Sequence, residues 1–438
     1  MSGEAASPVG GATSIDGTKA EARPAGRSPL LIVLFTVFVD LIGFGVVVPL
    51  LPFYNRSFGG GPAILGLLIA SFFLMQFLLA PVLGRLSDRF GRRPVLLATL
   101  CVTTASHLIL AAANSLAFLF LARILAGTAA GNLSVARAYI ADRTRPEERA
   151  RGMGLIGAAF GVGFAVGPVI GGTLVPFGLS APALAAATLA ATNLVLAAIA
   201  LPESLPPELR TVRGAPKTAG LGEVLRRPSI RLLVLTFLVV SFAFSTVPVA
   251  FPSLGIEYFG FVEQQLAAIF VLIGAVQIVV GVMVGRLAKR AGEERLVAFG
   301  ILAMGTAMAA TPWIRDVAAY VLLVGLFAMG VALTMPLLLS LVSKRTPARE
   351  QGSILGAAQA FGSLGVVPGP LVAGFLYEQV SPAAPFLVSA VLMGAGFLMT
   401  LLVYRESRRM TPTVATISAR SMRRSPGRDV IEGRPARR

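Results

Sequence analysis

Two charged residues, Asp40 and Arg123, lie inside apolar stretches of the sequence at positions where they could handle a proton. Asp40 comes about ten residues into one stretch and Arg123 about seven residues into another, so membrane-spanning helices would hold them at similar depths. Ionisable groups there are costly and usually mark a functional path. Burial disfavours a charged carboxylate, which makes Asp40 a candidate proton carrier near neutral pH, although a nearby Arg123 would oppose protonation. The alternative is a static role, with Asp40 paired to Arg123 or hydrogen-bonded to backbone beside Gly43 and Gly45.

The stretches that hold these residues have the length of membrane spans, which need about 20 apolar residues each. Of the 438 residues, 55% are apolar and 13% are charged, which excludes a soluble enzyme, a disordered protein and a nucleic-acid module. The single Cys101 and single His107 argue against a disulfide framework and a metal site. We predict an all-α integral membrane protein with twelve spans, at 29–53, 62–83, 94–113, 116–138, 152–175, 181–201, 230–254, 264–285, 296–313, 317–341, 352–376 and 383–404.

The distribution of basic residues orients the spans. With both termini cytoplasmic, 34 Lys and Arg residues fall in inner segments and only Arg56 and Arg315 in outer loops, a strong positive-inside signal. The net charge of +17 therefore reflects membrane topology rather than nucleic-acid binding. We expect a disordered cytoplasmic N-tail (1–28), an N-terminal six-helix bundle (29–201), a proline-containing cytoplasmic linker (202–229), a C-terminal six-helix bundle (230–404) and a basic cytoplasmic C-tail (405–438).

The two halves repeat each other at a spacing of about 200 residues. Gly84-Arg85-Leu86 recurs as Gly285-Arg286-Leu287, and the glycines and proline of span 5 recur in span 11 at an offset of 202. Repeated halves around a central site are typical of transporters with alternating access. The residues repeated in spans 5 and 11 are Gly154, Gly163, Gly167, Pro168 and Gly172, which match Gly356, Gly365, Gly369, Pro370 and Gly374.

The segment after span 2 fits the pattern G-x-x-x-D-R-x-G-R-R at every specified position, from Gly84 through Asp88 to Arg93. Its glycines permit tight turns, and its charges can form a latch that opens and closes the cytoplasmic side. The alternative is a positive loop that only sets topology. The residues assigned to this cytoplasmic gate are Gly84, Asp88, Arg89, Gly91, Arg92, Arg93 and Asp142.

With this motif the region 29–404 resembles the major facilitator superfamily, in particular the twelve-span drug:proton antiporters of its tetracycline-efflux-like group. The resemblance implies that Asp88 holds the gate against the end of helix 11, and that Arg89 meets an acid between spans 4 and 5, which Asp142 matches. It also implies that the acid of span 1, Asp40, is functionally required and that Arg123 takes part in proton transfer. Arg137, nearer the cytoplasmic end of span 4, is expected to snorkel.

Span 5 resembles the antiporter motif of the same proteins. Glycines four residues apart permit close helix contact and Pro168 bends the helix, so packing is the direct role, while the resemblance implies an exporter. The matching residues are Gly163, Gly167, Pro168, Gly171 and Gly172. The sequence departs from the tetracycline pumps in span 3, where Ser106 and His107 stand in place of an acid, so tetracycline itself is not the expected cargo.

Cargo contacts are expected from amides and aromatic rings within the spans, which suit apolar, amphiphilic or weakly cationic drugs. The same side chains could instead serve packing and interhelical hydrogen bonds. The candidates are Phe72, Phe73, Gln76, Asn132, Phe244, Gln277, Gln359 and Phe361.

These observations predict a proton-coupled exporter of a small, largely apolar or amphiphilic molecule in a bacterial cytoplasmic membrane. The alternative is a proton-linked importer of a metabolite on the same fold. We expect that the protein is not an enzyme and that it has no catalytic residue, no metal and no cofactor beyond the coupling proton. Expected partners are the small-molecule substrate and the lipid bilayer, without ATP or nucleic acid, and the expected state is a monomer. The sequence has no G-x-x-x-x-G-K-[ST] motif that would bind ATP.

Overall fold

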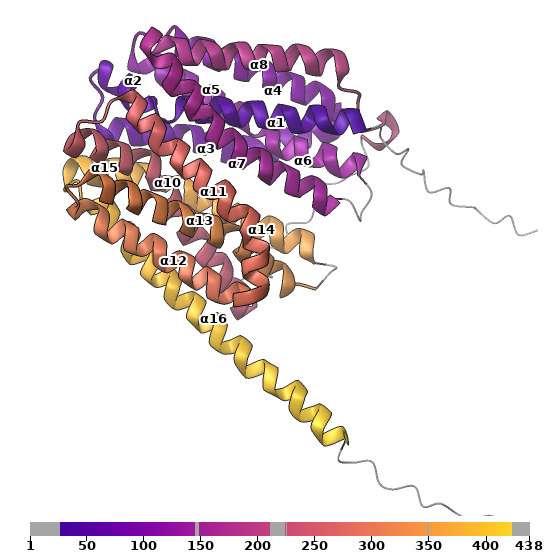
Figure 1. Cartoon of the computed structure of the whole chain (residues 1–438). Helices are drawn as coiled ribbons and strands as arrows, with labels where there is room; N and C mark the ends of the chain where they lie inside the picture. Colours follow the sequence, from indigo (N-terminus) through magenta and orange to yellow (C-terminus); the bar gives the residue numbers. More distant parts are fainter. Residues whose placement is uncertain (1–26, 145–148, 211–223, 225, 348–349, 423–438) are drawn as a thin grey trace, which may run out of the picture.

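The computed structural model describes residues 27–144, 149–210, 224, 226–347 and 350–422, and within them the regular secondary structure is helical. The first half contains α1 (Arg27–Val47), α2 (Leu51–Ser57), α3 (Pro62–Phe90), α4 (Arg92–Ala111), α5 (Leu116–Ala130), α6 (Asn132–Arg143), α7 (Arg149–Leu174) and α8 (Ser180–Ala200). The second contains α10 (Pro228–Phe259), α11 (Glu263–Ala291), α12 (Glu293–Ala310), α13 (Val317–Lys344), α14 (Gln351–Val366), α15 (Pro368–Gln379) and α16 (Ala384–Met422). Figure 1 shows these halves as two separate helical bundles, here called the N-bundle and the C-bundle.

The helices agree with the predicted all-helical membrane fold. Within the described residues, eleven helical stretches are long and apolar enough to cross a membrane, and Gly161–Phe177 forms a shorter apolar stretch at the position expected for span 5. Outside the described residues lie 1–26 of the predicted N-tail, 211–223 and 225 of the linker, and 423–438 of the predicted C-tail. The linker's described part contains the short 3₁₀ helix Pro207–Leu209, and α16 continues without a break past the predicted end of span 12 at 404.

Three of the predicted spans are each divided into two helices. Span 1 comprises α1 and α2, span 4 comprises α5 and α6, and span 11 comprises α14 and α15. Pro52 stands near the start of α2 and Pro368 starts α15, where the missing N–H is tolerated because the first turn of a helix has no intrahelical partner for it. The break in span 4 falls at Gly131, where an added Cβ would lie 2.8 Å from Leu83 Cδ1.

The internal repeat corresponds to matching turns in the two bundles. α3 is joined to α4 by Gly91 alone (φ 103°), and α11 is joined to α12 by Gly292 alone (φ 85°), 201 residues later. Both positions need the positive φ that glycine adopts without steric cost. α3 continues through Pro81 and Gly84 to Phe90, so the loop expected at 84–93 is instead the last turns of a helix and a one-residue turn.

Two pairs of the repeated glycines make equivalent contacts within the two bundles. Gly163 and Gly167 of α7 pack on α1, where a Cβ at Gly167 would lie 2.6 Å from the carbonyl oxygen of Ile42. Gly365 and Gly369 pack on α10 in the same way, where a Cβ at Gly365 would lie 2.3 Å from the Leu238 carbonyl oxygen. Each pair of helices therefore approaches with its backbones in contact, as small residues permit in membranes.

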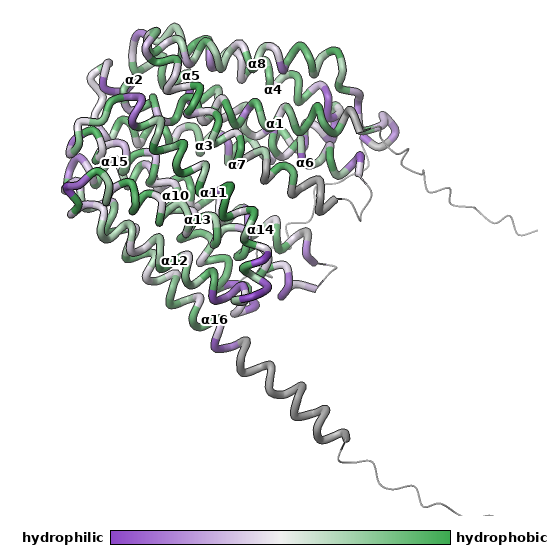
Figure 2. The backbone as a smooth tube through the Cα atoms, viewed as in Figure 1, coloured by the Kyte–Doolittle hydropathy of each residue, from purple (hydrophilic) through white to green (hydrophobic). Residues whose placement is uncertain are grey.

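Apolar side chains fill the bundles and also cover their outside. In the C-bundle, Phe251 packs against the rings of Tyr320, Phe327 and Phe386, and the Tyr320 hydroxyl donates to the Phe251 carbonyl at 3.0 Å. Figure 2 shows hydrophobic residues along the outer helices as well. Large side chains such as Ile199, Leu322 and Val391 are at least 73% exposed there, which fits a surface covered by lipid rather than water.

The bundles meet at one end of the molecule, here called the α2 face, which carries α2 and the start of α3. The opposite end, which carries Arg92, Glu203 and Arg405, is here called the linker face. In Figure 1 the bundles lie together at the α2 face and diverge toward the linker face. Their contact is built on glycines, because a Cβ added at any of four positions would meet the opposite bundle. A Cβ at Gly66 would lie 2.3 Å from Pro370 O, and a Cβ at Gly374 would lie 2.3 Å from Pro62 O. A Cβ at Gly172 would lie 2.8 Å from Ala267 Cβ, and a Cβ at Gly274 would lie 2.6 Å from Ala165 Cα.

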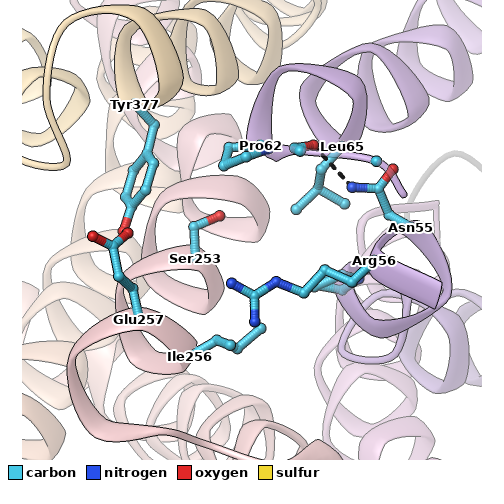
Figure 3. Close-up of a pocket in the computed structure, with 11 residues that line it drawn as sticks. Asn55, Arg56, Pro62, Leu65, Ser253, Ile256, Glu257 and Tyr377 are labelled. Atoms are coloured by element: carbon cyan, nitrogen blue, oxygen red, sulfur yellow. Dashed lines mark hydrogen bonds between the residues drawn. The ribbon is translucent and has the colours of Figure 1, made fainter. Parts of the chain in front are cut away.

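Polar groups complete this contact at the α2 face. The backbone N–H of Ala63 donates to Glu378 Oε2 at 2.8 Å, which joins the start of α3 to the end of α15. Figure 3 shows Arg56 of α2 pointing toward Ser253 of α10, beside the hydrogen bond in which the Tyr377 hydroxyl donates to Glu257 Oε2 at 2.7 Å. The cavity among these groups has a volume of about 30 Å³, which is room for water but not for a drug-sized molecule.

Candidate functional site

Asp40 lies inside the N-bundle with an amide, not a cation, as its hydrogen-bond partner. Nδ2 of Asn132, the first residue of α6, donates to Asp40 Oδ2 at 2.5 Å. The second oxygen, Oδ1, is buried and has no hydrogen-bond partner among the described residues. A buried carboxylate with one neutral partner is poorly compensated as an anion and well placed to hold a proton.

Arg123 is enclosed separately. Its guanidinium carbon lies 4.5 Å from the centre of the Phe72 ring, and the residue is 4% exposed. The arrangement is a cation–π contact, which stabilises a desolvated guanidinium. The Nε atom has no hydrogen-bond partner in the described part of the chain. The structure therefore places Asp40 against Asn132 and Arg123 against Phe72, rather than pairing the two charges.

His107 of α4 borders the same region. Its Nδ1 lies 2.9 Å from the Thr103 carbonyl oxygen, a hydrogen bond when the proton is on Nδ1. On its other side the ring touches α1, because a Cβ at Gly43 would lie 3.0 Å from His107 Cε1 and Nε2. Gly43 is one turn from Asp40, so the glycine makes room for the imidazole beside the carboxylate's helix. His107 and its neighbour Ser106 are both buried.

A row of aromatic rings crosses from the N-bundle to the C-bundle next to this site. Phe72 contacts Phe73 and Phe44, with ring centres 5.3 and 5.2 Å away. Phe44 lies 6.1 Å from Phe164 of α7, and Phe164 lies 6.3 Å from Phe270 of α11 in the other bundle. Since Phe44 is one turn nearer the α2 face than Asp40, these rings separate Asp40 from that face.

The charged motif at the linker face forms a network centred on Arg92. Arg92 is buried; its Nη1 lies 2.7 Å from Asp88 Oδ1 and 2.6 Å from Ser87 Oγ, and its Nε donates to Asp142 Oδ2 at 3.1 Å. The resemblance implied Arg89 as the partner of Asp142, and this was wrong. The guanidinium of Arg89 instead lies 5.3 Å from the ring of Phe90, and Arg89 is exposed.

Glu203 was missed in the sequence, although it connects the linker to the same network. Its Oε1 accepts from the backbone N–H of Arg92 at 2.9 Å and its Oε2 from that of Arg93 at 3.2 Å, so the carboxylate lies at the start of α4. An acidic group there is stabilised by the unpaired N–H groups of the helix. Arg93 extends from this point to the Ala198 carbonyl, 2.6 Å away. Nothing in the spacing of residues 92 and 203 predicts their contact.

The glycines of the antiporter motif have a packing role on two sides of α7. Gly163 and Gly167 contact α1, and a Cβ at Gly171 would lie 3.0 Å from the Val46 carbonyl oxygen. Gly172 instead faces α11 in the other bundle. Pro168 lies inside α7 and its Cδ is 3.1 Å from the Cβ position of Gly45. One helix thus joins the Asp40 helix to the contact between the bundles.

The structure brings together only part of the predicted cargo set. Phe72 and Phe73 belong to the aromatic row and Asn132 bonds Asp40, whereas Gln76 lies 3.5 Å from the Ala130 carbonyl oxygen and packs within the N-bundle. Phe244 and Phe361 pack against the C-bundle core, and Gln277 is half-buried on α11. Gln359 accepts a hydrogen bond from Arg137 Nη1 at 2.7 Å. The expectation that Arg137 snorkels was therefore wrong: its side chain extends from α6 to the other bundle.

Comparison with known proteins agrees with this architecture. The model of the Major Facilitator Superfamily matches residues 33–370 and 319–427, and the chain belongs to this family of membrane carriers, which are not enzymes.

Several relatives among curated proteins carry resistance names. The chain is 34% identical to the class C tetracycline resistance protein of Escherichia coli, covering 80% of this chain and 90% of that protein. It is 29% identical to multidrug resistance protein 2 of Bacillus subtilis, covering 87% and 96%. Among solved structures, the human organic anion transporter MFSD10 is similar, with a TM-score of 0.66 and 27% identity over 85% of this chain and 99% of that one. The protein is thus a multi-pass membrane transporter for small molecules.

Proposed function

We propose that the protein is a proton-coupled exporter of small amphiphilic molecules, which works by alternating access in a bacterial cytoplasmic membrane with the linker face in the cytoplasm. The observation that carries the proposal is the Asp40 carboxylate, which lies in the interior with a neutral partner and one unpartnered oxygen. Such a group can take up and release one proton per cycle. The names of the relatives support export. A monomer contains all the side chains that this mechanism uses.

The conformation supports the same mechanism. The bundles are in contact at the α2 face and the aromatic row lies between that face and Asp40, so the site would be reached from the linker face. Export requires a second arrangement in which the α2 face opens while the linker face closes. Protonation of Asp40 from outside and its deprotonation to the cytoplasm would give the cycle its direction.

Flux measurement in proteoliposomes tests the proposal. With purified protein reconstituted and the linker face outside, an acidic lumen should drive cargo inward against its gradient, and an uncoupler should abolish this. Dyes that multidrug exporters carry serve as first probes, and vesicles without protein give the background. Cargo accumulation in the same direction as proton movement would favour the alternative, a proton-linked importer of a metabolite.

Asp88→Asn tests the proposed latch at the linker face. The Asp88 side chain is 41% exposed and forms an ion pair with Arg92. When Asp88 is replaced by the neutral Asn, Arg92 retains its ion pair with Asp142. A half-exposed ion pair contributes little stability, roughly 0–1 kcal/mol, so the variant should fold. We expect slower turnover, with cargo affinity changed by less than about twofold. Initial rates at varied cargo concentration measure both quantities, with the exposed Asp316→Asn as control; equal turnover in the two variants would remove the latch.

A further inference from the structure

Arg137 and Gln359 connect the two bundles within the membrane-spanning part of the fold. Arg137 lies six residues before the end of α6 and Gln359 eight residues after the start of α14, which places them about 9 and 12 Å from those helix ends. Arg137 Nη1 donates to Gln359 Oε1 at 2.7 Å. The contact is on the side of the linker face, where the bundles diverge.

The charge of Arg137 has an amide as its partner. Within the membrane-spanning segments that the structure describes, Asp40 bonds Asn132, Arg123 lies over Phe72 and Arg137 bonds Gln359. No described carboxylate forms an ion pair with either arginine. Cations at such depth are costly and ordinarily pair with an anion. The interior of the described fold therefore carries excess positive charge.

Only one of the two arginines is accessible to a ligand. Arg123 is 4% exposed beneath Phe72, whereas Arg137 is half-buried and Gln359 is exposed. One turn away on α14, a Cβ added to Gly356 would have no atom within 4 Å, so the space beside Gln359 is open. Arg137 uses one of five guanidinium donors in the contact with Gln359, and the Gln359 amide has two donors of its own.

We propose that Arg137 and Gln359 bind the acidic group of the cargo, so that the transported class is amphiphilic organic anions. A carboxylate or sulfonate would replace the Gln359 oxygen at Arg137 and accept from the Gln359 amide, in charge-assisted hydrogen bonds to both bundles. This inference rests on the proposed export function and replaces the expectation of apolar or weakly cationic cargo. Because the groups come from opposite bundles, an anion bound there links cargo binding to their relative position.

Equilibrium binding to the full-length protein in nanodiscs tests the inference without a proton gradient. Fluorescein, an anion, and rhodamine 123, a cation, share a ring system, and fluorescence anisotropy gives a dissociation constant for each dye. We expect the wild type to prefer fluorescein. Arg137→Gln should weaken fluorescein binding about tenfold or more and leave rhodamine 123 binding unchanged, whereas Arg137→Lys should retain part of the affinity. Gln359→Glu should abolish fluorescein binding, because its carboxylate occupies Arg137.

Arg286→Gln is the matched control, since Arg286 is an exposed arginine on α11. The inference is overturned if the wild type does not bind fluorescein, if it binds rhodamine 123 more tightly, or if Arg137→Gln and Arg286→Gln give the same fluorescein affinity. Its failure is distinct from failure of the proposed function. Binding that depends on Arg137 without pH-driven flux would contradict only the coupling, and pH-driven flux of rhodamine 123 alone would contradict only the anion site.

Discussion

We expect the Asp40→Asn substitution to abolish uphill transport of cargo. The substitution keeps the shape of the side chain and its contact with Asn132, but an amide cannot carry a proton. For exchange of one proton per cargo molecule at zero membrane potential, a difference of one pH unit sustains about a tenfold cargo gradient, or about 1.4 kcal/mol. The wild type should reach a gradient of that order in proteoliposomes, and the Asp40→Asn variant should reach none.

Two measurements distinguish the loss of proton coupling from the loss of folded protein. Exchange of labelled for unlabelled cargo without a gradient should persist in Asp40→Asn, since that reaction moves no net proton. Asp316→Asn, the same substitution at a residue that caps α13 through the Ala319 N–H, should transport like the wild type. Uphill transport by Asp40→Asn at the wild-type level would show that another group carries the proton.

Gly374→Ala should shift the protein toward the arrangement that is open at the α2 face. The added Cβ would lie 2.3 Å from the Pro62 carbonyl oxygen in the opposite bundle, and a backbone oxygen cannot move aside as a flexible side chain would. Overpacking of this kind costs about 1–3 kcal/mol, which changes a conformational equilibrium roughly 5- to 150-fold. Because the clash lies between bundles, the closed arrangement carries the cost.

Thiol labelling measures the shift. Ser253 is 7% exposed at the cavity of Figure 3, so a cysteine placed there in a Cys101→Ser background reports opening from the α2 face. A membrane-impermeant maleimide should react at least about fivefold faster when Gly374→Ala is present. Gly394→Ala is the control, since a Cβ there meets nothing within 4 Å. Equal labelling in both variants would refute the assignment, and Gly66→Ala offers an independent check from the other helix.

Much of the architecture could be predicted from the sequence because it depends on local patterns. Length and hydropathy located the spans, and the glycines repeated at an offset of 202 marked the helix faces that pack in both bundles. The depth of Asp40 followed from counting residues along a helix. The breaks inside spans 1, 4 and 11 were missed, since a proline or glycine in an apolar stretch is compatible with either a continuous or a divided helix.

The partners of the charged residues could not be predicted, because they depend on contacts between distant segments. Arg137 and Gln359 are 222 residues apart in the chain, and Glu203 and Arg92 are 111 apart. Arg89 lies in the last turn of α3 and Arg92 starts α4, and only the packing of these two helices around α6 decides which arginine reaches Asp142. Asn132 was expected to contact cargo because an amide in a span signals a polar partner, but the sequence did not show that the partner is Asp40.

The glycines between the bundles also set an energy scale for the conformational cycle. At Gly66, Gly172, Gly274 and Gly374 the boundary between the bundles carries glycines, which contribute no side chain to it. Each buried CH₂ group contributes about 0.8 kcal/mol, so a boundary filled with leucines would require far more work to separate than one proton can deliver. Glycines at these positions lower the work of separating the bundles, which favours two end states that are close in free energy. A transporter powered by a single ion needs that balance, because any deeper minimum would trap it on one side of the membrane.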